Sequence, residues 1–191
     1  MEFDRLGFVL GFLDEAQGRH VRDDEADLVE SFFRDETDRV PLLARQLDAL
    51  ARERNLDRAT SASEDGRTVF RGRAVAELIN ASYENVQPSP YLDLATGRPV
   101  GRLLRVSLPM FRDPRASLSY LAGAYARYGH DGTFRIPIAE HKVDVIARLL
   151  AARGCTDLVV TYHPTHVPRV YVLSCQKSPE VATWLDGARR A

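Results

Sequence analysis

Cysteine and long apolar runs are both scarce in this sequence, and each shortage excludes a class of protein. Its 191 residues contain two cysteines, Cys155 and Cys175, too few for the disulfide framework of a small secreted domain. No stretch approaches the roughly 20 consecutive apolar residues that a membrane-spanning helix needs. Because the amino terminus also lacks a basic start followed by an apolar run, we expect a soluble cytoplasmic protein with no membrane partner.

The usual catalytic and cofactor motifs are absent as well. There is no Gly-x-Ser-x-Gly elbow and no glycine-rich phosphate loop ending in Gly-Lys-Ser or Gly-Lys-Thr. Gly7 and Gly11 fall within a helical pattern rather than after a strand, so they do not form a dinucleotide-binding fingerprint. Cys155 follows a helix-stopping glycine and Cys175 ends an apolar strand, which is typical of core thiols. The sequence therefore predicts no cofactor.

Lysine is rare, and charge is unevenly distributed along the chain. Of the 26 basic residues, 24 are arginine, an excess that a bacterial-type, GC-rich genome explains without any ligand. Residues 1–65 carry 17 acids against 9 arginines, a balance of −8, whereas residues 66–191 carry a balance of +7. Complementary charges of this kind speed the encounter of two surfaces and select partners.

The first 55 residues have the pattern of an acidic helical segment. Apolar residues at three-to-four spacing predict a helix over residues 3–16. A second helix is predicted over residues 23–33, because an aspartate can cap it and acids suit its first turn. Its buried stripe would consist of Val29, Phe32 and Phe33. A third helix is predicted over residues 41–54, with a proline in its first turn.

The rest of the chain has a different pattern. Residues 56–68 are small and polar without periodicity, which predicts a linker or mobile loop. Residues 69–191 then predict an α+β domain with a mostly antiparallel sheet. Its strands are expected over residues 91–94, 98–106, 133–138, 158–162 and 169–173, and its helices over residues 117–128, 143–150 and 178–188. The predicted fold class is α+β, with about three amino-terminal helices preceding this domain.

His163 and His166 are the candidate catalytic residues, because they stand three apart in a loop that follows a predicted strand. Either could act as a base or as a metal ligand. A protein metal site needs three or four ligands, and no second motif has ligand spacing, so we expect no bound metal. The available completions would be Glu140 with His141, or His130 with Asp131.

Three arginines are the candidate anion-binding residues, namely Arg102, Arg105 and Arg169. In the strand over residues 98–106, Arg102 and Arg105 would point to opposite faces unless a bulge intervenes. The basic residues therefore do not form one stripe, and a pI near 6.5 is not the basic footprint of a typical nucleic-acid-binding domain. A nucleic acid or phosphate ligand stays open as an alternative.

Two functions fit these observations. The leading hypothesis is a cytoplasmic interaction or regulatory protein that binds a protein partner, or itself, through oppositely charged surfaces. The alternative is a small hydrolase or phosphoryl-transfer enzyme, in which the His loop supplies a base or ligand and the three arginines hold an anion. The sequence leaves open whether the protein is an enzyme, what its partner or substrate is, and its oligomeric state.

Overall fold

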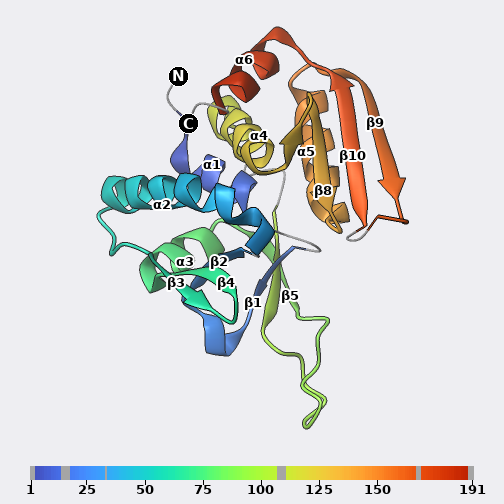
Figure 1. Cartoon of the computed structure of the whole chain (residues 1–191). Helices are drawn as coiled ribbons and strands as arrows, with labels where there is room; N and C mark the ends of the chain where they lie inside the picture. Colours follow the sequence, from blue (N-terminus) through green and yellow to red (C-terminus); the bar gives the residue numbers. More distant parts are fainter. Residues whose placement is uncertain (1–2, 14–17, 33, 107–110, 167–168, 189–191) are drawn as a thin grey trace. The chain divides into compact units, whose positions relative to one another are not determined.

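The computed structural model describes residues 3–13, 18–32, 34–106, 111–166 and 169–188 (Figure 1). These residues form six α-helices and ten strands in three antiparallel sheets. The chain divides into two compact units, one of Met1–Gly18 with Leu108–Ala191 and the other of Arg19–Ser107. Among the described helices, none is long and apolar enough to cross a membrane.

The described chain repeats one order of elements. The helices are α1 (Arg5–Phe12), α2 (Val40–Arg54), α3 (Arg73–Asn80), α4 (Pro114–Tyr128), α5 (Glu140–Ala152) and α6 (Pro179–Ala188). The strands are β1 (Arg19–Val21), β2 (Leu28–Phe32), β3 (Thr60–Glu64), β4 (Arg67–Arg71), β5 (Glu84–Pro88), β6 (Arg102–Arg105), β7 (Gly129–His130), β8 (Thr133–Pro137), β9 (Thr156–His163) and β10 (Val170–Gln176). The order helix, two strands, helix, two strands, helix therefore occurs twice, and β5 and β6 stand between the two copies.

The sheets follow the same repeat. The second copy forms one sheet of order β7-β8-β10-β9, and the first copy forms β2-β4-β3, in which the corresponding three strands are neighbours in the same order. The first copy differs at β1, which pairs with β6 in a third sheet of order β1-β6-β5. Because β1 pairs with β6, one of the two strands between the copies, it is absent from the β2-β4-β3 sheet, where the repeat would place it beside β2.

Helices α1 and α4 both begin at a capping aspartate. The Asp4 carboxylate accepts a hydrogen bond from the Gly7 N–H at 2.6 Å, and the Asp113 carboxylate accepts one from the Arg115 N–H at 3.0 Å. These bonds satisfy N–H groups that have no partner within a first helical turn. The Asp4 N–H also donates to Ser119 Oγ at 2.8 Å, which ties the start of α1 to α4.

The two helices then approach each other backbone against backbone, and glycine makes this approach possible. A Cβ atom on Gly11 would overlap the Tyr120 carbonyl oxygen, and one on Gly123 would overlap the Phe8 carbonyl oxygen. Each glycine therefore faces the residue three positions before the other glycine. This reciprocal contact relates the first helices of the two copies by an approximate two-fold.

In the unit of Met1–Gly18 with Leu108–Ala191, helices cover one face of the β7-β8-β10-β9 sheet. Phe134 pairs with Leu173 and Ile136 pairs with Tyr171, and residues that pair across antiparallel strands share a face. Phe134, Ile136 and Leu173 are fully buried. The Tyr125 ring on α4 lies 5.3 Å from the Phe134 ring, and α5 contacts β9 and β10. The core of this unit thus lies between the helices and this face.

A buried arginine connects three elements of the other unit. Arg19 on β1 is almost fully buried and donates to the carbonyl oxygens of Val29 and Leu28 on β2, each at 2.8 Å. Its Nε donates to Asn80 Oδ1 at the end of α3, at 2.6 Å. Burial of a guanidinium is tolerated because several acceptors replace its lost water.

The prediction of about three helices in residues 1–55 is wrong. Helices α1 and α2 are present, but residues 23–32 form a 3₁₀ turn at Asp23–Glu25 followed by strand β2. The acids fill the turn, and Phe32 is buried against Phe70 of the neighbouring strand β4, with ring centroids 6.1 Å apart. Pairing with β4 overrides the local helical spacing. Phe33, the last residue of the expected stripe, lies outside the described residues.

Residues 56–68 contain regular structure as well. Strand β3 pairs with β4 along its length, and Asp65 and Gly66 join them in a tight turn with φ angles of 46° and 77°. The boundaries of the two compact units lie elsewhere, between Gly18 and Arg19 and between Ser107 and Leu108. The division into 1–55 and 69–191 stays a prediction about which parts fold independently.

We expect Gly123→Ala to destabilise the protein by about 1–3 kcal/mol, because the added methyl group meets the rigid backbone of α1. The matched control is Ala151→Ser, which adds one heavy atom at an exposed helix position and should change stability by less than about 0.5 kcal/mol. Urea unfolding followed by circular dichroism measures both. Equal midpoints for the two variants would contradict the close helix contact.

Candidate functional site

The second face of the β7-β8-β10-β9 sheet is open to solvent. Val172 pairs with Arg135 on one side and with Thr161 on the other, so these three side chains share this face. The same pairing places Val159 beside Ser174. The face thus comprises Arg135 and Pro137 of β8, Val170, Val172 and Ser174 of β10, and Val159, Thr161 and His163 of β9, all exposed or half-buried.

The open face combines a cationic group with hydroxyl and methyl groups. Arg135 and Thr161 are exposed on it, and Val159 is an exposed apolar residue. Across β8, β9 and β10 the only acid is Asp157, which stands near the start of β9 with a positive φ of 53°. Such a surface can offer hydrogen bonds and apolar contacts to a ligand without repelling an anion.

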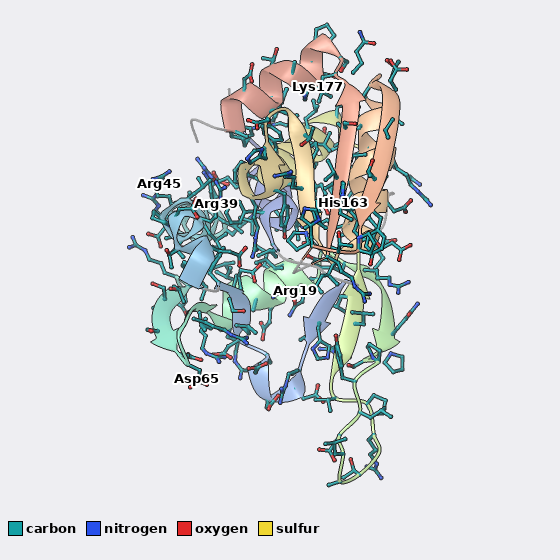
Figure 2. The ribbon with its side chains drawn as sticks, turned by 45° about the vertical axis from the view of Figure 1, so that its right-hand side comes forward. Arg19, Arg39, Arg45, Asp65, His163 and Lys177 are labelled. Carbon is teal, nitrogen blue, oxygen red and sulfur yellow. The ribbon has the colours of Figure 1, made fainter. Side chains whose placement is uncertain are left out.

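The structure brings the two predicted histidines together. The rings of His163 and His166 lie 5.1 Å apart, where β9 ends. Figure 2 shows His163 at one end of the β9–β10 pair and Lys177 at the other. Among the described residues, no group of three His, Cys, Asp or Glu side chains is placed to hold a metal ion. The catalytic role assigned to His163 and His166 stays a prediction.

The three predicted anion-binding arginines lie in both units. Arg102 and Arg105 are the first and last residues of β6, in the unit Arg19–Ser107. Arg169 immediately precedes β10 in the other unit and is exposed, and its carbonyl oxygen accepts a hydrogen bond from the Ile138 N–H at 3.0 Å. Arg169 thus stands beside the open face, next to Val170, and its anion-binding role stays a prediction.

The β2-β4-β3 sheet has a different charge on its corresponding face. Arg71 on β4 donates two hydrogen bonds of 3.0 Å to the Glu64 carboxylate and a third of 3.0 Å to Asp27. The Glu25 carboxylate lies 4.0 Å away. A hollow of about 310 Å³ lies beside Arg71, and the residues that line it include Glu25, Glu64 and Asp65. Carboxylates thus enclose the guanidinium and take up its charge.

This ion network predicts a pH dependence. The hydrogen bond from Arg71 holds the pKa of the Glu64 carboxyl below its ordinary value of 4.5. A lowered pKa stabilises the folded protein above pH 4.5, and this contribution is lost as the pH falls through the lowered pKa. Glu64→Gln should therefore lower Tm at pH 7, and its difference from the wild type should shrink as the pH falls below 4.5 and the Glu64 carboxyl is protonated.

Differential scanning calorimetry from pH 7 down to about pH 3 tests this expectation. Glu77→Gln, at an exposed position of α3, is the matched control and should show no such convergence. A Tm difference between the wild type and Glu64→Gln that stays constant across this range would show that the Glu64 carboxylate contributes nothing through its charge.

Two buried cations hold the carboxyl-terminal end of α1. Lys142 on α5 is fully buried, and its ammonium group donates to the carbonyl oxygens of Leu10 and Leu13. Arg127 on α4 is almost fully buried and donates to the Phe12 carbonyl oxygen at 3.1 Å. These carbonyls have no partner within the helix, and the helix dipole makes this end negative. Positive charge is therefore favourable here.

Aromatic rings surround both cations. The Lys142 ammonium lies 5.5 Å from the Tyr120 ring centre and 5.7 Å from that of Tyr128. The Arg127 guanidinium lies 5.5 Å from the Tyr128 ring and 5.8 Å from the Phe12 ring. Ring faces attract cations and partly replace their hydration. The sequence showed no signal for this cluster, because its members come from three separate helices.

Lys142→Met should destabilise the protein by about 1–3 kcal/mol, because it leaves the Leu10 and Leu13 carbonyls without this donor. Arg148→Met, at an exposed position of the same helix, should change stability by less than about 0.5 kcal/mol. Urea unfolding distinguishes the two. An unchanged or higher midpoint for Lys142→Met would show that methionine packs as well as the buried ammonium.

Comparison with known proteins identifies the fold but no family. No protein-family model matches the sequence, and no curated protein matches it. Solved structures of the homing endonuclease I-DmoI do match. A structure from a study of its mesophilic variants has a TM-score of 0.56 at 14% identity, covering 98% of this chain and 96% of that chain. I-DmoI in complex with DNA and Ca has a TM-score of 0.54 at 14% identity, covering 94% and 95%.

A single-residue variant of I-DmoI, in complex with its target DNA in the presence of Mg, has a TM-score of 0.57 at 14% identity and covers 98% of this chain and 96% of that chain. This fold overturns the hypothesis of a regulatory protein with oppositely charged surfaces. The charge balance was a poor guide to separate surfaces, because residue 65, where the summed charge along the sequence changes from acidic to basic, lies inside the β3–β4 hairpin. There Arg71 pairs with Glu64 and Asp27 within one unit.

Proposed function

We propose that this protein binds double-stranded DNA, and that the open face of the β7-β8-β10-β9 sheet lies in the major groove. The observation that carries the proposal is this solvent-exposed sheet face, which displays Arg135 of β8 on one side of β10 and Thr161 and Val159 of β9 on the other. The likeness of the whole fold to I-DmoI, which has been crystallised with its target DNA, supports it.

The dimensions of the strands suit a groove. A strand rises about 3.3 Å per residue, so the 8 residues of β9 span about 26 Å. The major groove of B-DNA is about 12 Å wide and admits a two-stranded β-ribbon. The β9–β10 pair is therefore narrow enough to enter the groove and long enough to contact several successive base pairs.

The side chains on the open face match what a groove offers. Arg135 can donate a bidentate pair of hydrogen bonds to guanine, and Thr161 can bond to several bases. The valine methyl groups can contact the methyl group of thymine. Arg169, exposed at the start of β10, would bind a phosphate, and phosphate contacts set orientation without reading sequence.

The other sheet is a poorer candidate for this role. On its corresponding face, Glu64, Asp27 and Glu25 surround Arg71 and neutralise it. A DNA backbone carries one negative charge per about 1.7 Å of helix axis and would be repelled by such a surface. We therefore assign the primary contact to the sheet with Arg135.

The proposal is for binding, with no cleavage step. I-DmoI has been crystallised with Ca, Mn and Mg, and such hard cations take oxygen ligands, carboxylates above all. The described residues provide no group of three metal-binding side chains, and the end of α1 is held by two cations.

Fluorescence anisotropy with a labelled 24-bp duplex of mixed sequence tests the proposal. Binding should weaken as salt is raised, because phosphate contacts release counterions. Arg135→Gln should weaken binding by about tenfold. The matched control, Arg148→Gln, removes an exposed arginine from α5 and should leave the affinity unchanged.

Two results would contradict the proposal. The first is that the wild type fails to bind the duplex at low salt. The second is that Arg135→Gln and Arg148→Gln weaken binding equally, which would show attraction to positive charge anywhere on the protein rather than docking of the open face.

A further inference from the structure

A long hairpin projects from β5 and β6, the two strands that stand between the copies of the repeat. It connects β5 to β6 and is called the arm here, residues 89–101. Figure 1 shows it extending well beyond the strands that carry it. Neither copy of the repeat includes these two strands among its elements. The arm is therefore an addition to the repeated fold, and its shape needs an explanation of its own.

The arm is held together by its own backbone. The Asp93 N–H donates to the Arg98 carbonyl oxygen at 2.8 Å, and the Val100 N–H donates to the Tyr91 carbonyl oxygen at 2.9 Å. Leu92 forms a bridge with Pro99. These contacts cross between the two halves of the arm, so it has one defined conformation rather than that of a flexible loop.

The base of the arm is fixed to strand β1. His20 Nε2 lies 2.8 Å from Ser89 Oγ and 2.9 Å from the Val100 carbonyl oxygen. The His20 ring also meets the Tyr91 ring edge to face, with centroids 5.2 Å apart. At Gly101, with a φ of 79°, a side chain would collide with the backbone of Val21. The arm thus projects from an anchored base.

The tip displays apolar side chains that contact little of the protein. Leu94 is fully exposed at 102% of its reference area, and Leu92 is 57% exposed. Exposing large apolar groups to water is unfavourable, and contiguous ones mark a binding site. A rigid arm that presents leucine at its tip is suited to place it inside a partner.

The charges of the arm favour an anionic partner. Its one acid is Asp93, and that carboxylate accepts hydrogen bonds from the N–H groups of Ala95 and Thr96 and from the Thr96 hydroxyl. Arg98 is exposed on the arm, and Arg102 is exposed where the arm returns to β6. The carboxylate is thus engaged in shaping the turn, and the two guanidinium groups are presented to solvent.

We propose that the arm inserts Leu94 between stacked base pairs, while Arg98 contacts a flanking phosphate. Duplex DNA combines an anionic surface with an apolar interior that opens at a base step, and other proteins kink DNA with leucine wedges. This inference rests on the proposed function, since it requires the protein to bind duplex DNA. It assigns to the arm a separate contact, outside the open face of the β7-β8-β10-β9 sheet.

Permanganate oxidation of thymine tests the inference, because unstacked thymines react faster than stacked ones. The probe is a 30-bp duplex with several TpA steps, which unstack easily. Full-length wild-type protein should raise thymine reactivity at one or more of these steps by several-fold. Leu94→Ser should abolish this rise and weaken binding by about tenfold.

The matched control is Ala95→Ser, which changes the neighbouring exposed residue of the same turn and should behave as the wild type. Both positions are exposed, so neither substitution should alter folding. Anisotropy on the same samples reports binding, and sedimentation velocity reports the oligomeric state.

The outcomes separate the arm from the proposed function. If wild-type protein binds the duplex but thymine reactivity does not rise, or rises equally with Leu94→Ser, the wedge is wrong and duplex binding stands. If Leu94→Ser instead turns a dimer into a monomer without changing thymine reactivity, the tip binds a second copy and the wedge is again wrong. If wild-type protein does not bind the duplex, both proposals fail.

Discussion

The structure depends on the backbone contact between α1 and α4. Gly11 and Gly123 each lie against a carbonyl of the opposite helix, and any side chain at either position would force the helices apart. The contact joins segments 112 positions apart in the sequence and relates the first helices of the two copies. The buried Lys142 and Arg127 complete it by binding the carbonyls at the end of α1. Burying two cations is costly, so the negative helix end and the surrounding rings are needed to hold them.

Charge is arranged within units rather than between the halves of the sequence. Arg71 contacts carboxylates from the turn before β2 and from β3, so three acids of the amino-terminal half are paired within one unit. The β7-β8-β10-β9 sheet keeps Arg135 exposed, with few acids beside it. The same repeated arrangement of strands thus has one face on which carboxylates neutralise the arginine and one on which the arginine stays exposed.

The sequence predicted elements whose pattern is local and missed those set by distant contacts. Helix α2 and the pair β9–β10 were predicted correctly, since an amphipathic stripe and β-branched runs specify them. Residues 23–32 were predicted as helix from their local spacing, and the contact of Phe32 with Phe70 of β4 leaves no signal in the local sequence. Gly11 was recognised as part of a helical pattern, but its contact with the backbone of α4 has no local signal. The strand expected over residues 133–138 is β8, which lies between β7 and β10, with Pro137 as its last residue. Of the residues on the open face, His163 was named from the sequence because an imidazole can act as a base. Arg135 and Thr161 could be assigned to the same face only from the strand register.

The most direct test of the DNA-binding account is methyl NMR of the protein titrated with a 24-bp duplex. Val170 and Val172 lie on the open face, whereas Leu173 and Ile136 lie on the buried face of the same sheet, so neighbouring residues serve as internal controls. The account predicts that the methyl signals of Val159, Val170 and Val172 shift on addition of duplex while those of Leu173 and Ile136 do not. Shifts confined to other surfaces, with the open-face valines unchanged, would contradict it.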